Sequence, residues 1–263
     1  MKDFLKTILA RKREEVQAEK SRTSLARLRD RPLFSAPRRS MSAALTGNGC
    51  AIIAEVKKAS PSKGILRRSF DHKQIARDYA EGGANALSVL TDREFFQGNR
   101  SYLEDLRGIV TVPLLRKDFI IDPYQLVESK AYGADAILLI VAALDPQQLK
   151  DLHAESSALG LECLVEVHSE EELSLLSGIN ARIVGVNNRN LASFETDLQN
   201  SLRLRPLLPG GAIAVSESGI TSVGDVRKLA ANGYDAVLIG ELFMKSAEPG
   251  KALKRLKMEL GNT

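Results

Sequence analysis

Charged side chains follow a short apolar run near the start of this 263-residue chain. The run at 51–54 reads Ala-Ile-Ile-Ala, and Glu55 and Lys57 come within three residues of its end. Such a run is typical of a buried β-strand, and an isolated charge at its end would be costly to bury. A lysine beside a carboxylate can transfer protons or bind an anion, which gives this strand end a possible chemical role.

Later apolar runs also end in polar residues, namely Lys117, Glu166, Asn187, Arg189 and Glu217. Alternate side chains of a strand point to the same face, so Glu55 and Lys57 share one face and Lys58 lies on the other. A structural ion pair explains Glu55 and Lys57 equally well when they are taken alone. Several polar strand ends meeting at one mouth favour a pocket that binds a multiply anionic substrate and transfers protons.

Eight apolar runs rich in Val, Ile and Leu alternate with helical patterns from residue 50 onward. The predicted strands are 51–57, 86–91, 112–117, 136–141, 163–167, 183–187, 212–217 and 236–240. Strict alternation of strands and helices predicts a parallel sheet of the α/β class. Eight units fit a (β/α)8 TIM barrel, whose active sites lie at the carboxyl ends of the strands. An open Rossmann-like sheet is the alternative, but no G-x-G-x-x-G follows the first predicted strand.

Turns and capping signals mark the ends of the predicted helices. Three similar turns join a helix to a strand, and each begins with a glycine suited to the left-handed residue that ends a helix, at Gly83, Gly133 and Gly233. Helix starts are predicted at Asp122-Pro123 and Asp145-Pro146, and capping boxes at Ser101-x-x-Glu104 and Ser169-x-x-Glu172.

Residues 1–49 precede the barrel and differ from it in charge. They hold 12 Lys/Arg and 5 Asp/Glu, whereas residues 50–263 hold 25 and 28. Apolar residues at helical spacing predict a helix from Phe4 to Lys20, and residues 31–40 predict a loop. We expect residues 1–49 to form an N-terminal helical extension packed on the barrel, within a single domain spanning 1–263.

The composition limits the possible partners and cofactors. No apolar stretch approaches the roughly 18 residues of a membrane helix, and the N-terminus lacks the long apolar region of a secretory signal. We therefore expect a cytoplasmic protein with no membrane partner. Cys50 and Cys163 make no disulfide framework. The three histidines, His72, His153 and His168, are scattered, so we expect no metal.

The basic extension raises the possibility of nucleic-acid binding, but a solvated helical face is the favoured explanation. The chain has no Trp and only 5% aromatic residues, so platforms for stacking bases are scarce. We expect no nucleic-acid partner and a monomer.

The last two predicted strands are followed by glycine-containing turns, Ser218-Gly219 and Gly240-Glu241. In barrels of this class, the loops after the last two strands often bind phosphate through backbone N–H groups. The sequence therefore predicts a phosphorylated small-molecule substrate. An apolar wall for a ring is also predicted near the ends of three other strands, although rim packing explains each residue alone, at Phe96, Phe119 and Leu138.

The chain resembles the indole-3-glycerol phosphate synthases over nearly its whole length. The matching stretches, in order, are ILARKREEV (8–16), AEVKKASPSKG (54–64), EFFQG (94–98), LRKDFI (115–120), LVEV (164–167), VNNRNL (186–191) and SESGI (216–220). The combination of E-x-K-x-x-S-P-S with L-x-K-D-F is highly specific.

The resemblance implies a carbon–carbon lyase that closes the indole ring of 1-(2-carboxyphenylamino)-1-deoxyribulose 5-phosphate, with loss of carbon dioxide and water, in tryptophan biosynthesis. This implied lyase function carries the expectation of no cofactor. Lys117 matches the general acid that protonates the substrate carbonyl, and Glu166 a second proton-transfer residue. Lys57 matches a lysine that contacts substrate anions and could assist a later proton transfer. The resemblance does not show which of the two lysines carries out which proton transfer.

The resemblance implies further site residues. Glu55 and Asn187 match residues that hold these groups and the substrate hydroxyls. The implied substrate-binding positions are Ser60 and Arg189 near the anthranilate carboxylate, Glu217 at the seventh strand end, Ser218, Gly219 and Gly240 at the phosphate, and Phe96, Phe119 and Leu138 at the apolar wall.

Two expectations concern charge inside this pocket. Burial or a neighbouring cation would lower the pKa of Lys117 toward neutrality; Lys57 near Lys117 would lower the pKa of both lysines, while Glu55 would oppose the change for its partner. Glu241 stands where some relatives carry serine, and a carboxylate repels phosphate, so we expect its side chain to turn away. The residues alone leave two other functions open, a Schiff-base aldolase with Lys117 as nucleophile and a noncatalytic anion or nucleic-acid binder using the basic arm.

Overall fold

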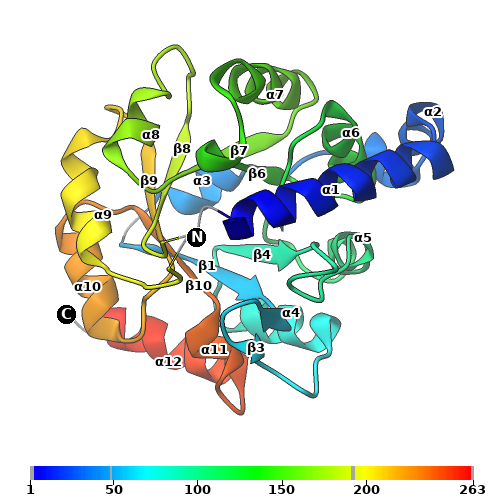
Figure 1. The fold of residues 1–263 in the computed structure, drawn as a ribbon. Helices are drawn as coiled ribbons and strands as arrows, with labels where there is room; N and C mark the ends of the chain where they lie inside the picture. The colour runs from blue at the N-terminus through cyan, green and yellow to red at the C-terminus, as the bar shows by residue number, and fades with distance from the viewer. Residues whose placement is uncertain (1–2, 48, 191–192, 262–263) are drawn as a thin grey trace.

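Eight parallel strands close into a barrel in the computed structural model, which describes residues 3–47, 49–190 and 193–261. The strands are β1 (Ala51–Val56), β4 (Ala86–Leu90), β5 (Leu114–Lys117), β6 (Ala136–Ile140), β7 (Glu162–Val167), β8 (Ile183–Asn187), β9 (Ile213–Glu217) and β10 (Ala236–Ile239). Each strand pairs with its neighbours in chain order, and β10 pairs with β1 to close the ring (Figure 1). The predicted (β/α)8 barrel and its eight strands are confirmed, and the open sheet is excluded.

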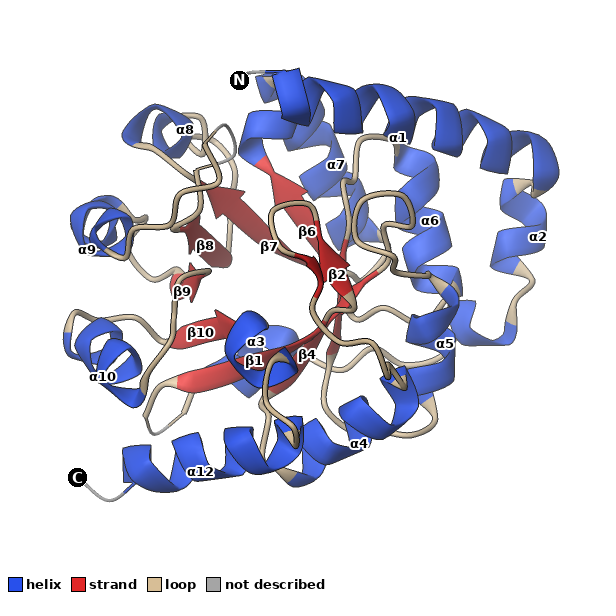
Figure 2. Ribbon diagram, turned by 60° about the horizontal axis from the view of Figure 1, so that its bottom comes forward, coloured by secondary structure: helices blue, strands red, loops and turns tan. Residues whose placement is uncertain are grey.

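Helices surround the barrel (Figure 2). They are α4 (His72–Glu81), α5 (Ser101–Arg107), α6 (Pro123–Ala131), α7 (Pro146–Ala158), α8 (Glu170–Ser174), α9 (Gln199–Leu204), α10 (Val223–Ala231), α11 (Glu241–Met244) and α12 (Pro249–Gly261). Gly83, Gly133 and Gly233 have φ angles of 91°, 90° and 84°, which confirms the left-handed glycines predicted at these turns. An antiparallel pair of short strands, β2 (Ala59–Ser60) and β3 (Gly64–Ile65), stiffens the loop after β1 and was not predicted.

The capping predictions are partly confirmed. Asp122 and Asp145 cap α6 and α7 as expected. Ser169 caps α8 by accepting from the backbone N–H of Glu172, but the Glu172 carboxylate accepts from the backbone N–H of His168, so the box is not reciprocal. The box at Ser101 is wrong. Ser101 is already helical, and its N–H donates to Asn99 Oδ1 at 3.0 Å, so the upstream asparagine takes the capping place.

Two apolar layers follow from the alternation of strand side chains. Ile52 belongs to the layer between the barrel and its helices, whereas Ile53 belongs to the barrel interior. Glu55 has the parity of Ile53, so the interior continues into a charged residue at the carboxyl end of β1. That placement confirms the inward direction predicted for this strand end.

The extension before the barrel contains α1 (Asp3–Arg22), α2 (Leu25–Arg29), a 3-10 turn at Pro32–Phe34 and α3 (Met41–Leu45). The helix predicted from Phe4 to Lys20 is confirmed, while the loop predicted at 31–40 contains the 3-10 turn. Figure 1 shows α1 lying across one side of the barrel. Ile8 and Leu9 of α1 pack on the barrel interior cluster. Among the described residues, no helix is both long and apolar enough to cross a membrane.

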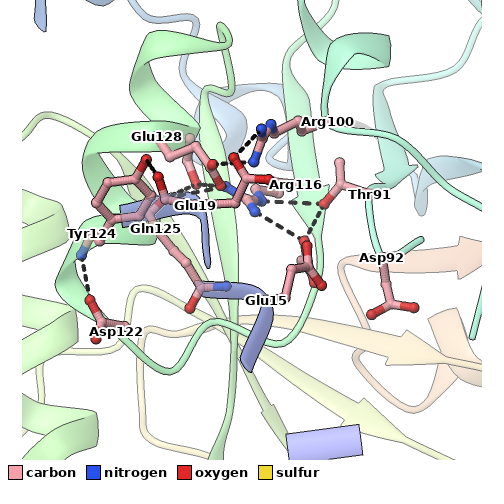
Figure 3. A network of polar contacts seen from close by, with 12 residues as sticks. Glu15, Glu19, Thr91, Asp92, Arg100, Arg116, Asp122, Tyr124, Gln125 and Glu128 are labelled. Atoms are coloured by element: carbon pink, nitrogen blue, oxygen red, sulfur yellow. Dashed lines mark hydrogen bonds and ion pairs between the residues drawn. The ribbon is translucent and has the colours of Figure 1, made fainter. Parts of the chain in front are cut away.

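A buried ionic network joins α1 to the barrel. Lys12 is only 2% exposed, and its Nζ lies 2.9 Å from Asp92 Oδ2 and 2.8 Å from Asp118 Oδ1. Arg116 contacts Asp118 at 3.0 Å and Glu128 at 2.8 Å. Figure 3 shows Arg116 and Arg100 converging with Glu19, Glu128 and Thr91. Since Asp118 follows Lys117 directly, its contacts with Lys12 and Arg116 hold the carboxyl end of β5 in place.

Candidate active site

A cavity opens at the carboxyl ends of the strands, with an empty volume of about 1180 Å³ when its mouth is included. Every site residue predicted from the sequence lines it, and they come from loops and strands spread around the whole barrel. These are Glu55, Lys57, Ser60, Phe96, Lys117, Phe119, Leu138, Glu166, Asn187, Arg189, Glu217, Ser218, Gly219 and Gly240. Lys58 is not part of the lining, in agreement with its strand parity.

Glu55 and Lys57 form an ion pair inside this cavity. Glu55 is 4% exposed, and Gly240 of the last strand end packs directly against it. A Cβ at Gly240 would lie 2.3 Å from Glu55 Oε2, so only glycine leaves room for the carboxylate. The pairing considered as a structural alternative does occur, but it stands within the pocket and leaves Lys57 facing it.

Lys117 lies among carboxylates at the centre of the cavity. Its Nζ is 3.3 Å from Glu166 Oε2 and 3.7 Å from Glu217 Oε2. Burial alone would lower the pKa of Lys117, but Glu166, Glu217 and Glu55 together raise it well above its ordinary value. The expectation of a lowered pKa is therefore wrong, because the surrounding carboxylates outweigh the effect of burial. Lys117 stays protonated at neutral pH.

The two carboxylates beside Lys117 differ in charge, although each side chain is 1% exposed. Burial and then the neighbouring Glu166 raise the pKa of Glu217 well above its usual range, so Glu217 holds a proton. Burial would also raise the pKa of Glu166, but Lys117 and His168 lower it below its ordinary value, so Glu166 is ionised. Gly185 in β8 makes space for this pair, since a Cβ there would lie 2.2 Å from Glu217 Oε1.

Asn187 and Arg189 organise the end of β8. Asn187 Oδ1 accepts from the backbone N–H of Arg189 at 3.0 Å, and the Asn187 side chain helps to lower the pKa of Glu166 after Lys117 and His168. The Arg189 guanidinium donates to Ser62 Oγ at 3.2 Å and so reaches the loop after β1. Leu191, the last residue of the VNNRNL stretch, lies outside the described residues.

The turn after β9 has an unusual backbone. Ser218 and Gly219 are consecutive residues with φ angles of 68° and 78°, and Ser218 is one of few non-glycine residues in this region. Thr196 closes over the turn, because a Cβ at Gly219 would lie 2.5 Å from Thr196 Cγ2. Two successive left-handed residues at a pocket wall suit close approach of an anion to the backbone.

Glu241 lines the cavity next to this turn, and its carboxylate is engaged by cations. Its Oε1 lies 2.5 Å from Lys245 Nζ, and its Oε2 lies 3.7 Å from Arg189. Although partial burial acts in the other direction, Lys245 lowers the pKa of Glu241. The orientation of this side chain toward a bound phosphate stays a prediction.

Aromatic and aliphatic side chains form the opposite wall. The rings of Phe96 and Phe119 have centroids 6.3 Å apart, and Leu138 is 1% exposed in the strand beside them. The N-terminal extension completes this wall, which the sequence alone does not indicate. Three residues of α1 line the cavity at helical spacing, Phe4, Leu5 and Ile8. Their periodicity was the available signal, but it did not show which surface the helix covers.

His168 is a second residue that sequence reasoning missed. Its Nε2 lies 3.4 Å from Glu166 Oε1, and its Nδ1 lies 3.1 Å from Glu172 Oε2. The signal in the sequence is position, because His168 follows Glu166 by two residues and so shares its strand parity, whereas histidine spacing alone indicates only the absence of a metal site. Within the described residues, no group of histidine, cysteine and acidic side chains is suited to hold a metal ion.

Comparison with known proteins decides the family. The family model described as "Indole-3-glycerol phosphate synthase" matches residues 5–256. An indole-3-glycerol phosphate synthase of Chromobacterium violaceum is 50% identical over 260 residues, covering 97% of this chain and 98% of the relative. The chain belongs to the indole-3-glycerol phosphate synthase family. It is thus a decarboxylating lyase of tryptophan biosynthesis. A second synthase, of Aromatoleum aromaticum, is 45% identical over 97% of this chain and 99% of the relative.

Solved structures support the fold alone. KGPDC from Streptococcus mutans has a TM-score of 0.62 at 12% identity and covers 81% of this chain and 98% of its own. The 3-hexulose-6-phosphate synthase from Salmonella typhimurium has a TM-score of 0.62 at 13% identity and covers 80% of this chain and 99% of its own. Both agree with a closed barrel.

Proposed function

We propose that the cavity binds 1-(2-carboxyphenylamino)-1-deoxyribulose 5-phosphate and closes its indole ring, with Lys117 as the general acid. The observation that carries this proposal is the partly buried Lys117 in the cavity, whose Nζ lies 3.3 Å from Glu166 Oε2, and the carboxylates around Lys117 raise its pKa and so favour its protonated form. As the aryl carbon attacks the substrate carbonyl, Lys117 gives its proton to the carbonyl oxygen. Carbon dioxide then leaves from the same aryl carbon, and its bonding electrons return to the ring.

Dehydration completes the indole. Glu166 is the ionised carboxylate of the pair, so it accepts the proton that leaves carbon as the new double bond forms. The hydroxyl departs as water with a proton from Lys57 or Lys117. Glu55 and Asn187 hold Lys57 and Glu166 in place.

The remaining lining residues bind the substrate. Ser218, Gly219 and Gly240 receive the phosphate, and Ser60 and Arg189 receive the anthranilate carboxylate. Phe96, Phe119 and Leu138 pack on the aromatic ring, and neutral Glu217, whose carboxyl oxygens have no hydrogen-bond partner among the described residues, donates a hydrogen bond to the substrate. An anchored phosphate supplies orientation to an otherwise flexible chain.

The direct test adds the carboxyphenylamino-deoxyribulose phosphate to the purified protein and follows indole fluorescence. Formation of indole-3-glycerol phosphate without added metal or organic cofactor is the expected outcome. Absence of product from the wild-type protein would refute the proposal.

A Schiff-base reaction on the same lysine predicts a different outcome. That chemistry needs the neutral amine, which the carboxylates around Lys117 oppose. Borohydride added during turnover should therefore trap no adduct on Lys117. A trapped adduct would favour the Schiff-base mechanism over acid catalysis.

We also propose a cytoplasmic monomer whose extension and barrel form one domain and that binds no nucleic acid. Several basic residues of the extension are engaged within the protein, which supports this. Lys12 is buried among carboxylates, and Arg38 and Arg39 donate to backbone carbonyls of the barrel. Size-exclusion chromatography with light scattering should give one 28.7 kDa chain, and salt-sensitive DNA binding would contradict the proposal.

A further inference from the structure

His168 stands between the active-site cavity and a second, open groove. The groove is lined by polar side chains of the β7, β8 and α9 region, including His168, Glu172, Asn200 and Arg203. Glu166 lines the active-site cavity but not this groove, whereas His168 lines the groove but not the cavity. The 3.4 Å contact between His168 Nε2 and Glu166 Oε1 therefore connects the two spaces.

The position of His168 is fixed on several sides. Its backbone N–H donates to Glu172 Oε2 at 2.7 Å, and its carbonyl accepts from Asn200 Nδ2 at 3.1 Å. The ring Nδ1 contacts the same Glu172 oxygen at 3.1 Å. The Nε2 atom is buried and has no hydrogen bond of normal geometry to the described residues, and the carboxylate in contact with it is that of Glu166, at 3.4 Å.

The proposed reaction needs a source of protons. Two protons are given up in each turnover, one to the carbonyl oxygen and one to the departing hydroxyl, while one is taken from carbon. The deficit is one proton, which matches loss of the substrate carboxylate as neutral carbon dioxide. Because substrate fills the cavity, a route that avoids its mouth is an advantage.

We propose that His168, held by Glu172, carries this proton from water in the groove to Glu166, from which Lys117 is reprotonated. The protonated ring donates its Nε2 proton to Glu166 Oε1, while Nδ1 keeps its proton and its contact with Glu172 Oε2. Glu166 then passes a proton to Lys117 Nζ across 3.3 Å. The neutral ring, which keeps its Nδ1 proton, then turns into the groove that it lines, takes a proton from water at Nε2 and turns back to Glu166, which restores the starting state. The inference rests on the role proposed above for Glu166.

The charges around His168 favour a protonated ring. Burial lowers the pKa of His168, but Glu172 and Glu166 outweigh it and raise the pKa above its ordinary value, with Lys117 opposing them. Other charged groups along the groove are Lys6, Arg189, Glu195, Asp197 and Arg203. His168 does not touch the space for substrate, so it is a positioning and relay residue acting through Glu166.

The test compares His168→Gln with wild type in the indole fluorescence assay. Loss of the relay should lower kcat about tenfold, less than the hundredfold or more expected for a group acting directly on substrate. KM should stay within twofold, because the residue lies outside the cavity. In His168→Gly, which leaves the place of the ring empty beside Glu166, added imidazole should restore kcat in a concentration-dependent way, since it can enter from the open groove.

The pH profile separates a relay from simple support of Glu166. In wild type, kcat should fall at high pH as His168 loses its proton, and His168→Gln should lack that limb. Glu172→Gln should shift the limb to lower pH, because the carboxylate that raises the pKa is gone. This variant also tests the relay if His168→Gln does not fold. His153→Gln, on α7 away from the cavity, is the matched control and should behave as wild type.

The outcomes are distinguishable. Turnover of His168→Gln within twofold of wild type from pH 6 to 9 would overturn the relay and leave the lyase proposal intact. A loss of activity that imidazole does not restore and that is equal at all pH values would make His168 a structural residue only. Inactive wild-type protein would instead remove the proposed function on which the relay rests.

Discussion

Replacing Lys12 by methionine should destabilise the protein strongly. Lys12 of α1 is 2% exposed, and its Nζ contacts three carboxylates, Glu15, Asp92 and Asp118, within 3 Å. Methionine fills much of the same volume but leaves two aspartates buried without this cation. Removing one partner from a buried ion pair costs about 3–5 kcal/mol. Asp118 keeps Arg116 and Thr91 as partners, so we place the loss at the lower end, about 3 kcal/mol.

Urea and thermal unfolding measure this loss. For a chain of this size, 1 kcal/mol corresponds to about 2–4 °C, so the midpoint should fall by roughly 6–12 °C. Arg11→Met is the matched control, because Arg11 is an adjacent cation of the same helix with its side chain 55% exposed. Its unfolding midpoint should match that of wild type.

The loss of stability in Lys12→Met should depend on pH. The folded protein holds the pKa of Asp118 well below its ordinary value, since Lys12 and Arg116 outweigh the effect of burial. A lowered carboxylate pKa contributes stability that is complete above about pH 4 and is lost as the pH falls below it. The gap between wild type and Lys12→Met should therefore narrow below about pH 4.

Two results would refute this reasoning. One is a loss under 1 kcal/mol for Lys12→Met at pH 7, which would mean that the carboxylates reach solvent when the cation is removed. The other is the absence of coupling with Asp92→Asn. Because removing both partners leaves less uncompensated charge, the double variant should be more stable than the sum of the two single losses implies, by about 0.5–3 kcal/mol.

Three further predictions concern the cavity. Lys117→Ala and Glu166→Gln should each lower turnover at least about a hundredfold in the indole assay, the lower range for acid–base groups, and near-normal activity in either variant would remove that residue's role. Burial and Glu166 raise the pKa of Glu217, so its contribution to stability is complete below about pH 4.5 and is lost as the pH rises. The melting temperature of Glu217→Gln should therefore rise relative to that of wild type as the pH increases. A difference that stays constant with pH would show that Glu217 is already ionised in the folded protein. Gly240→Ala places a Cβ against Glu55 and should cost about 1–3 kcal/mol, whereas Gly210→Ala, with nothing within 4 Å, should match wild type in urea unfolding.

The sequence by itself determined the barrel fold and the polar residues at the carboxyl ends of its strands. Strand alternation and helix spacing are local periodicities, so they can be followed without knowing which elements touch. Parallel strands bring their carboxyl ends to one edge, and for this reason Glu55, Lys117 and Glu166 could be assigned to a common pocket from their places at strand ends.

Only the tertiary structure decided the charge state of the pocket and its outer wall. The pKa of Lys117 depends on distances across the barrel to Glu166 and Glu217, and these distances reverse the shift expected from burial and Lys57. The role of α1 as a wall, and the contact of His168 with Glu166, are likewise set by packing between segments. Electrostatic interaction falls with separation in space rather than along the chain. The order of residues therefore predicts that polar strand ends share one pocket, but it does not predict whether each of these groups is protonated.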